Sequence, residues 1–405
     1  MTPATRTQGS TLGSTLGTAL VLALGAAVSL GLARFSYALL LPPMRADLGW
    51  SYATAGAMNT ANAAGYLAGA LTMPALLRRL GPRCALVGGS AAVTLLLALH
   101  GWARADAALF ALRFASGVGS AAVFVAGGLM AAQLAATVPP GGRPSPSLVV
   151  GLYYGGTGLG IVACALLLPA LVARHWAPGW WGIAALAALA TVLLAARARV
   201  SAPPAATGAA ARASLRPLAF GLAGYFMFGL GYIGYMTFVV TLLREQQLST
   251  TVVTVFYALL GAAVVASPWL WAGLLQRHRG GRPMAVLNGL LAVATVLPVL
   301  APVLVPGPLL ALVSGALFGA VFLSVVGSTT ALVRHNLPPA AWPAGISAFT
   351  VVFAAGQIVG PWLVGRLADG PGGLAQGFVL SAALLALGSA LASRQKSVPQ
   401  QLQAR

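Results

Sequence analysis

Twelve apolar stretches, each about as long as a membrane-spanning helix, follow one another along the sequence. An α-helix rises 1.5 Å per residue, and about 20 apolar residues are needed to cross the hydrocarbon core of a bilayer. Such stretches lie at residues 16–42, 52–77, 84–102, 106–135, 148–173, 178–196, 217–243, 251–275, 284–305, 308–333, 344–367 and 373–393. The sequence therefore predicts an all-α membrane protein with twelve spanning helices.

The scarcity of charge argues against most enzyme classes. Only 7% of the residues are charged and 59% are hydrophobic, whereas about a quarter of the residues of a soluble domain are charged. The four acids, Asp47, Asp106, Glu245 and Asp369, are dispersed, so no cluster is available to hold a Mg²⁺–diphosphate. The single lysine, Lys396, lies in the tail, far from any phosphate-binding loop or Schiff-base position. We therefore expect no enzymatic activity and no cofactor.

The spacing of the two cysteines does not predict a metal site. Cys84 and Cys164 both lie in apolar stretches, and neither has a Cys or His partner at metal-ligand spacing. We expect both to be small residues of helix packing.

The basic residues predict the orientation of the chain. If the N-terminus is cytoplasmic, 16 of the 23 basic residues fall in cytoplasmic segments and all four acids fall at outer ends. The positive-inside rule then places both termini in the cytoplasm. The pI of about 11.6 follows from basic loops that face anionic lipid at the cytoplasmic surface, and it needs no nucleic acid. We expect a multi-pass protein of the bacterial plasma (inner) membrane with no required protein partner.

The chain has an internal repeat. A polar, Pro- and Arg-containing segment at residues 197–216 separates residues 1–196 from residues 217–405. A shift of 198 residues pairs Tyr37 with Tyr235 and Asp47 with Glu245, and a shift of 200 pairs Gly156 with Gly356. The sequence predicts an N-terminal six-helix bundle, a cytoplasmic linker and a C-terminal six-helix bundle, the parallel-repeat organisation of many secondary transporters.

Several short motifs resemble the major facilitator superfamily over about residues 16–393. Helix 4 follows a pattern of this superfamily at Leu109, Arg113, Gly117, Gly119, Ala121 and Ala122. The loop Arg79-Leu80-Gly81-Pro82-Arg83 and the helix ending Gly360-Pro361, Gly365 and Asp369 resemble two further motifs, although Pro74 and Arg78 replace the Gly and Asp of the loop motif. Arg34-Phe35-x-Tyr37 and Gly155–Ile161 resemble the bacterial YbfB/YjiJ-type branch. The resemblance implies transport by alternating access between two six-helix bundles.

Two arginines lie inside predicted spans, Arg34 in the first and Arg113 in the fourth. An arginine at the centre of a membrane helix costs about 2.5–3.5 kcal/mol on insertion scales, so an unused one is expected to be rare. No acid lies in a span at matching depth. Either backbone carbonyls and water satisfy the two guanidinium groups, or an anionic ligand does.

Other polar residues complete the predicted sites. Besides Arg34 and Arg113, the candidates for substrate binding are Tyr37, Tyr154, Tyr232, Tyr235 and Gln357. The candidates for gating are Asp47, Glu245, Arg79 and Arg83. The alternatives are hydrogen bonding between helices for the first set and solvated loop charges for the second.

The function that fits these patterns is secondary transport of a small organic solute, with an organic anion as the preferred class. The sequence lacks an ATP-binding motif and a buried acid, which favours exchange or co-transport in which the anion carries the charge. Export of amphipathic, drug-like compounds is the main alternative. A ligand sensor on a transporter scaffold and a membrane-embedded enzyme are two further alternatives.

Overall fold

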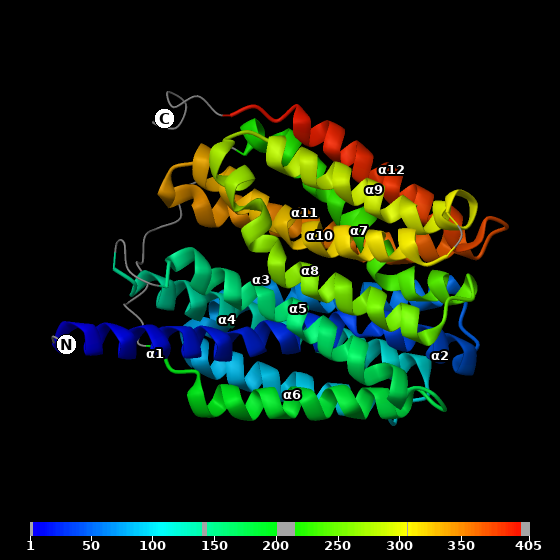
Figure 1. The fold of residues 1–405 in the computed structure, drawn as a ribbon, viewed down its shortest axis with the longest axis horizontal. Helices are drawn as coiled ribbons and strands as arrows, with labels where there is room; N and C mark the ends of the chain where they lie inside the picture. The colour runs from blue at the N-terminus through cyan, green and yellow to red at the C-terminus, as the bar shows by residue number, and fades with distance from the viewer. Residues whose placement is uncertain (1–2, 140–143, 201–214, 306, 398–405) are drawn as a thin grey trace. The chain divides into compact units, whose positions relative to one another are not determined.

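The computed structural model describes residues 3–139, 144–200, 215–305 and 307–397, and every regular element in these ranges is helical (Figure 1). The elements are α1 (Pro3–Ala26), η1 (Ala27–Phe35), α2 (Tyr37–Leu48), α3 (Tyr52–His100), α4 (Asp106–Ala136), α5 (Pro146–Leu171), α6 (Ala177–Arg197), η2 (Arg216–Leu218), α7 (Ala219–Glu245), α8 (Thr250–Arg277), α9 (Arg282–Leu304), α10 (Leu309–Asn336), η3 (Pro339–Ala341), α11 (Trp342–Ala368) and α12 (Gly373–Ser393). This confirms the predicted all-α class.

The number of long helices agrees with the predicted twelve spans once α3 is divided. The described residues form eleven long apolar helices, of which α3 has 49 residues. A straight helix of that length would extend roughly 70 Å, more than twice the thickness of the hydrocarbon core. Gly81 interrupts α3 with φ 73° and ψ 164°, and Pro82 follows it. The predicted spans 52–77 and 84–102 are therefore the two arms of α3.

The first span is a composite helix. α1 continues into η1, a π-helical segment of nine residues, and then into α2, so that one apolar helix extends from Ser14 to Leu48. The predicted span ends at residue 42, the first of the two consecutive prolines Pro42 and Pro43. Both prolines lie within α2, so the helix continues beyond the predicted end.

The chain divides into two compact units. The first unit comprises Met1–Ser36 and Gly65–Ala205, and the second comprises Tyr37–Ala64 and Ala206–Arg405. The predicted halves, 1–196 and 217–405, differ from these units because Tyr37–Ala64 groups with the second. The halves describe the sequence repeat and stay a prediction, and most of the predicted linker 197–216 lies outside the described residues.

Glycines bring equivalent helices close together in the two units. In the first unit α5 packs on α1 and η1, where a Cβ on Gly160 would lie 2.7 Å from the carbonyl oxygen of Ala27. In the second unit α11 packs on α7, where a Cβ on Gly356 would lie 2.7 Å from the carbonyl oxygen of Phe226 (Figure 1). Small residues let membrane helices approach to backbone contact. The two glycine strips that align in the sequence therefore have the same role, which is to allow close contact between two helices.

Candidate functional site

Arg34 is a buried cation with unused hydrogen-bond donors. Its side chain is 4% exposed, and its Nε and Nη2 atoms are buried without a hydrogen-bond partner in the described part of the chain. Its guanidinium carbon lies 5.7 Å from the centroid of the Tyr66 ring. These two nitrogens form one edge of the guanidinium plane, which is the edge that grips a carboxylate or phosphate through two parallel bonds.

The π-helical segment η1 carries Arg34 near its end. The Ser36 amide donates to the carbonyl oxygen of Gly31 at 3.2 Å, a bond over five residues. Gly31 allows this segment to lie against α5, because a Cβ there would be 2.6 Å from the Cα of Gly160. π-Helical segments occur frequently at functional sites. No feature of the apolar sequence Ala27–Phe35 distinguishes it from an ordinary α-helix, so the sequence did not predict it.

Arg113 has a partner that the sequence analysis left open. Its side chain is 1% exposed, and its Nη1 donates to the carbonyl oxygen of Ala33 at 3.1 Å. A backbone carbonyl therefore takes part in satisfying Arg113, and this carbonyl belongs to the residue before Arg34. Arg113 on α4 thus fixes the backbone that carries Arg34.

A group of tyrosines lies in the same unit. Tyr66, which the sequence analysis did not select, has its ring beside the guanidinium group of Arg34. Tyr153 donates to the carbonyl oxygen of Phe124 at 2.6 Å and contacts the Tyr154 ring at a centroid distance of 5.2 Å. Of the predicted site residues, Tyr154 is 38% exposed. The first unit therefore brings Tyr66 to Arg34, and it places Tyr153 against Tyr154.

Tyr232 and Gln357 meet in the second unit. Tyr232 on α7 occupies the position equivalent to Arg34 in the repeat, and its hydroxyl accepts a hydrogen bond from Gln357 Nε2 on α11. The Tyr232 ring contacts the rings of Phe228, at a centroid distance of 4.6 Å, and Phe353, at 5.6 Å. Two of the predicted binding residues are thus in direct contact, in an aromatic environment.

Tyr37 and Tyr235 are equivalent in the repeat but have different partners. Tyr37 donates to the carbonyl oxygen of Ala55 at 3.0 Å, which joins α2 to α3. Tyr235 exchanges a hydrogen bond of 2.7 Å with Ser314 on α10 and stacks on Phe318. Both side chains are at most 1% exposed. Their contacts serve helix packing, and the structure gives them no common site.

The predicted gating acids are exposed, and a side-chain hydrogen bond joins Glu245 to α3. Asp47 and Glu245 are both exposed. Glu245 accepts a hydrogen bond from the hydroxyl of Tyr52, the first residue of α3. Asp369, which was not among the predicted gating residues, accepts two backbone hydrogen bonds from the same end of α3. The sequence shows an acid at the end of this helix, but it does not show that the acid binds Tyr52, which lies 317 residues away.

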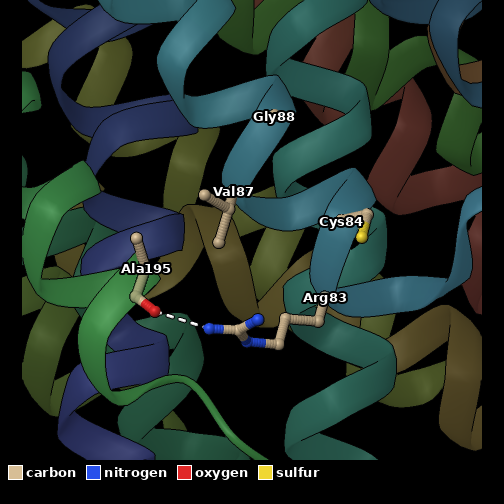
Figure 2. A pocket seen from close by; sticks show the side chains of 5 residues that line it. All are labelled: Arg83, Cys84, Val87, Gly88 and Ala195. Carbon is tan, nitrogen blue, oxygen red and sulfur yellow. Dashed lines mark hydrogen bonds between the residues drawn. The ribbon is translucent and has the colours of Figure 1, made fainter.

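The predicted gating arginines of the α3 turn have separate environments. Arg79 is exposed, whereas Arg83 donates to the carbonyl oxygens of Ala195 and Ala198 at 2.6 and 3.0 Å. A cation on the last carbonyls of a helix satisfies unpaired acceptors and favours the helix dipole. Figure 2 shows the Arg83 side chain reaching across to Ala195 beside a cavity of about 330 Å³. Arg83, Cys84, Val87, Gly88 and Ala195 line this cavity.

Cys164 and Cys84 have no metal-binding neighbours within the described ranges, where no group of three or more His, Cys, Asp or Glu side chains is placed to hold an ion. Cys164 is buried and lies 3.9 Å from the carbonyl oxygen of Gly31, and Cys84 is exposed.

Comparisons with known proteins identify the family. Residues 26–393 match a protein family described as "Uncharacterised MFS-type transporter YbfB". A search of curated proteins finds no matching relative.

Solved structures show the same fold. The nucleoside transporter NupG aligns with a TM-score of 0.70 at 13% identity, over 93% of this chain and 100% of that one. A bacterial homolog of the human lysosomal transporter Spinster aligns with a TM-score of 0.68 at 13% identity, over 95% of this chain and 99% of that one. The human organic anion transporter MFSD10 (TETRAN) aligns with a TM-score of 0.63 at 15% identity, over 92% and 98%. With the family match over most of its length, the chain belongs to the YbfB-type family of MFS transporters.

Proposed function

We propose that the protein is a secondary transporter that carries a small organic anion across the bacterial plasma membrane by alternating access. Arg34 carries the proposal, because its Nε and Nη2 atoms are buried without a partner in the described residues. Burying a charge without compensation is expensive, so a ligand that supplies the opposite charge is strongly favoured. A carboxylate or a phosphate fits the free edge of the guanidinium group with two parallel hydrogen bonds.

Arg113 has a different role in this proposal from the one that the sequence analysis preferred. Because Arg113 donates to the carbonyl oxygen of Ala33, it holds the backbone beside Arg34. Its own charge raises the positive potential around Arg34. The bound anion then compensates two buried cations while it contacts Arg34. Loss of Arg113 is therefore expected to reduce both stability and affinity, whereas loss of Arg34 acts mainly on affinity.

The solved neighbours do not select the substrate. By their names, one carries nucleosides and another carries organic anions. A common fold hosts many functions, so the substrate class has to be argued from the site. The unpaired edge of Arg34 argues for an anion, and the Tyr66 ring beside it supports a solute with an apolar part.

The lipid at the cytoplasmic surface is part of the proposal. With both termini cytoplasmic, the turn that carries Arg79 and Arg83 faces the inner leaflet. The cavity beside Arg83 is lined by one cationic and several apolar residues. This combination suits an anionic phospholipid, whose phosphate would lie near Arg83 and whose acyl chain would lie along Val87 and Gly88.

A screen of ligand classes tests the anion. Purified protein and an Arg34→Gln variant would be melted with carboxylates, sugar phosphates, neutral sugars and lipophilic cations. A ligand at 100 times its Kd stabilises the folded state by about 2.7 kcal/mol, which is measurable as a rise in Tm. We expect carboxylates or phosphates to stabilise the wild-type protein, and we expect no such effect in the variant.

Two outcomes of the screen would contradict the proposal. Stabilisation by neutral sugars alone would exclude the anion. Stabilisation by lipophilic cations alone would instead favour an exporter of amphipathic compounds, with the aromatic surroundings of Tyr232 as its binding surface.

A further inference from the structure

Two short basic segments cross at one end of the second unit. Residues 279–282, where α9 begins, read Arg-Gly-Gly-Arg, and residues 394–396, directly after α12, read Arg-Gln-Lys. The amide of Gly281 donates to the carbonyl oxygen of Gln395 at 2.8 Å, which joins the two segments near their centres. The crossing brings together four exposed basic side chains, named here the cation group: Arg279, Arg282, Arg394 and Lys396.

The crossing is fixed by backbone contact and by a buried amide. A Cβ on Gly281 would collide with the backbone of α12, and one on Gly280 would lie 2.8 Å from the carbonyl oxygen of Gln395. Gln395 is 5% exposed, and its side chain accepts from the Gly221 amide at 2.9 Å and donates to the carbonyl oxygen of Pro217 at 2.8 Å. These bonds also join it to the residues that lead into α7. Buried polar groups with both ends bonded are rigid, so the four cations are attached to a fixed backbone.

The cation group contains no acid to offset its charge. Each of its members lies within two residues of the bond between Gly281 and Gln395, which is roughly 8 Å or less along the chain. This distance is similar to the Debye length of about 8 Å at physiological salt, so the four charges repel one another. The four acids of the chain are at residues 47, 106, 245 and 369, and none is in either segment. Binding of an anion is therefore favoured at the crossing.

Exposed apolar side chains lead along two helices to the cation group. On α9, Val286 and Val293 are 38% and 50% exposed, and they follow Arg282 on one face of the helix. On α12, Leu387 is 47% exposed and lies two turns before Arg394 on the same face. Since α9 packs on α12 (Figure 1), an amphipathic ligand can lie along both helices with its polar end at the cation group.

We propose that the cation group binds the head group of an anionic phospholipid whose acyl chains lie along the exposed faces of α9 and α12. The cations form two pairs, one on each segment, so a lipid with two phosphates, such as diphosphatidylglycerol, should bind more tightly than a lipid with one. This site lies in the second unit, whereas the cavity beside Arg83 lies in the first. It rests on the proposed function only for the cytoplasmic position of these segments, and it requires no transport of an anion.

Native mass spectrometry measures lipid binding to the purified protein in a neutral detergent. All proteins carry Arg83→Gln, so that the cavity of the first unit contributes as little as possible. Each cation at an anionic lipid surface accounts for roughly a fivefold change in affinity. We therefore expect Arg282→Gln with Arg394→Gln to weaken the binding of diphosphatidylglycerol roughly 30-fold. With the cation group intact, diphosphatidylglycerol should bind more tightly than phosphatidylglycerol, and equal affinities would contradict a site for two phosphates.

The matched control is Arg174→Gln with Arg366→Gln, which removes the same charge from two exposed arginines outside both segments. It should change the affinity by less than about twofold. Equal weakening by the two pairs of substitutions would overturn the site, because the lipid would then respond only to the net charge.

A substitution that keeps every charge tests the crossing itself. Gly281→Ala places a methyl group against the backbone of α12 and should move the two segments apart. We expect it to weaken the binding of diphosphatidylglycerol severalfold, whereas Gly273→Ala, whose Cβ meets no atom within 4 Å, should leave it unchanged. If Gly281→Ala does not fold, Gly280→Ala is the milder form of the same test. Unchanged affinity in the folded variant would contradict a site that depends on the crossing.

A soluble anion distinguishes a lipid site from a phosphate site. Inorganic pyrophosphate carries two phosphates but no acyl chain, so it should displace diphosphatidylglycerol only at concentrations far above that of the lipid. Displacement at equal concentration would overturn the lipid as the ligand. Because the assay contains no transported solute, its result is independent of the ligand screen that tests Arg34.

Discussion

Arg34 and Tyr232 occupy equivalent positions in the two halves of the repeat, but their side chains are satisfied differently. Tyr232 has its hydroxyl bonded to Gln357 and its ring stacked on Phe228 and Phe353. Arg34 has one aromatic neighbour, Tyr66, and two donor nitrogens without a partner in the described residues. The Tyr232 hydroxyl is therefore hydrogen-bonded in the second unit, whereas Arg34 in the first unit keeps a charge and two hydrogen-bond donors that a ligand can satisfy.

The surrounding packing makes this difference informative. Both positions lie on a helix that contacts its partner through glycines, Gly31 with Gly160 in the first unit and Gly229 with Gly356 in the second. Both helices thus approach their partners closely, and the two positions differ in their side chains and in the π-helical turn of η1. The unpartnered donors of Arg34 are the reason why we propose the binding site in the first unit, and not at the equivalent position of the second.

The largest expected effect comes from removing the charge of Arg34. Arg34→Gln should weaken binding of the anion by about 2–5 kcal/mol, as when one partner of a buried charge pair is truncated. Arg34→Lys keeps the charge but loses the planar fork, so its loss of affinity should be smaller. Isothermal titration with the anion found in the ligand screen measures both. If well-folded Arg34→Gln binds the anion with unchanged affinity, the position of Arg34 is no more a binding site than the equivalent position of Tyr232.

The next effect comes from adding one methyl group to equivalent glycine strips. A Cβ on Gly160 would lie 2.8 Å from the Cα of Gly31, and one on Gly360 would lie 2.9 Å from Ile233 Cγ2. Overpacking of this kind costs about 1–3 kcal/mol, so both Gly160→Ala and Gly360→Ala should lower Tm. Only Gly160→Ala displaces the segment that carries Arg34, and only this variant should also weaken anion binding.

Gly273→Ala is the control for the glycine pair, because a Cβ there meets no atom within 4 Å. It should leave Tm unchanged or slightly raised, since alanine is the better helix former. Equal losses of anion affinity in Gly160→Ala and Gly360→Ala would show that the two units contribute equally to the site.

Much of the fold followed from the sequence, since the length of an apolar run directly reports a membrane span. The burial of Arg34 was also predictable, because a lone arginine inside such a run has few other interpretations. The partner of Arg113 was not, because the carbonyl of Ala33 lies 80 residues away and carbonyls leave no mark in a sequence. The grouping of Tyr37–Ala64 with the second unit depends on tertiary contacts alone. The π-helical turn leaves no compositional signal.

A smaller effect is expected at the closed position. Tyr232→Phe removes the hydroxyl that accepts from Gln357 and keeps the stacked ring. The amide of Gln357 is 1% exposed, and an unsatisfied buried donor costs about 1–3 kcal/mol. Tm should therefore fall, while the affinity for the anion should stay within about twofold. A loss of affinity comparable with that of Arg34→Gln would place Tyr232 in the binding site and reverse the comparison.

The smallest effect concerns two equivalent helix caps, Ser51 before α3 and Ser249 before α8. Ser51 accepts from the Thr54 amide at 3.1 Å, and Ser249 accepts from the Val252 amide at 3.3 Å. Each cap is worth about 1 kcal/mol, so Ser51→Ala and Ser249→Ala should lower stability by similar small amounts. At the start of α3, unlike the start of α8, two further amides donate to Asp369. In an Asp369→Asn background, Ser51→Ala should therefore cost at least ~0.5 kcal/mol more than it does alone, whereas Ser249→Ala should be additive. Thermal unfolding of the two double-mutant cycles decides this, and additivity in both cycles would mean that Asp369 and Ser51 do not share the stabilisation of the helix end.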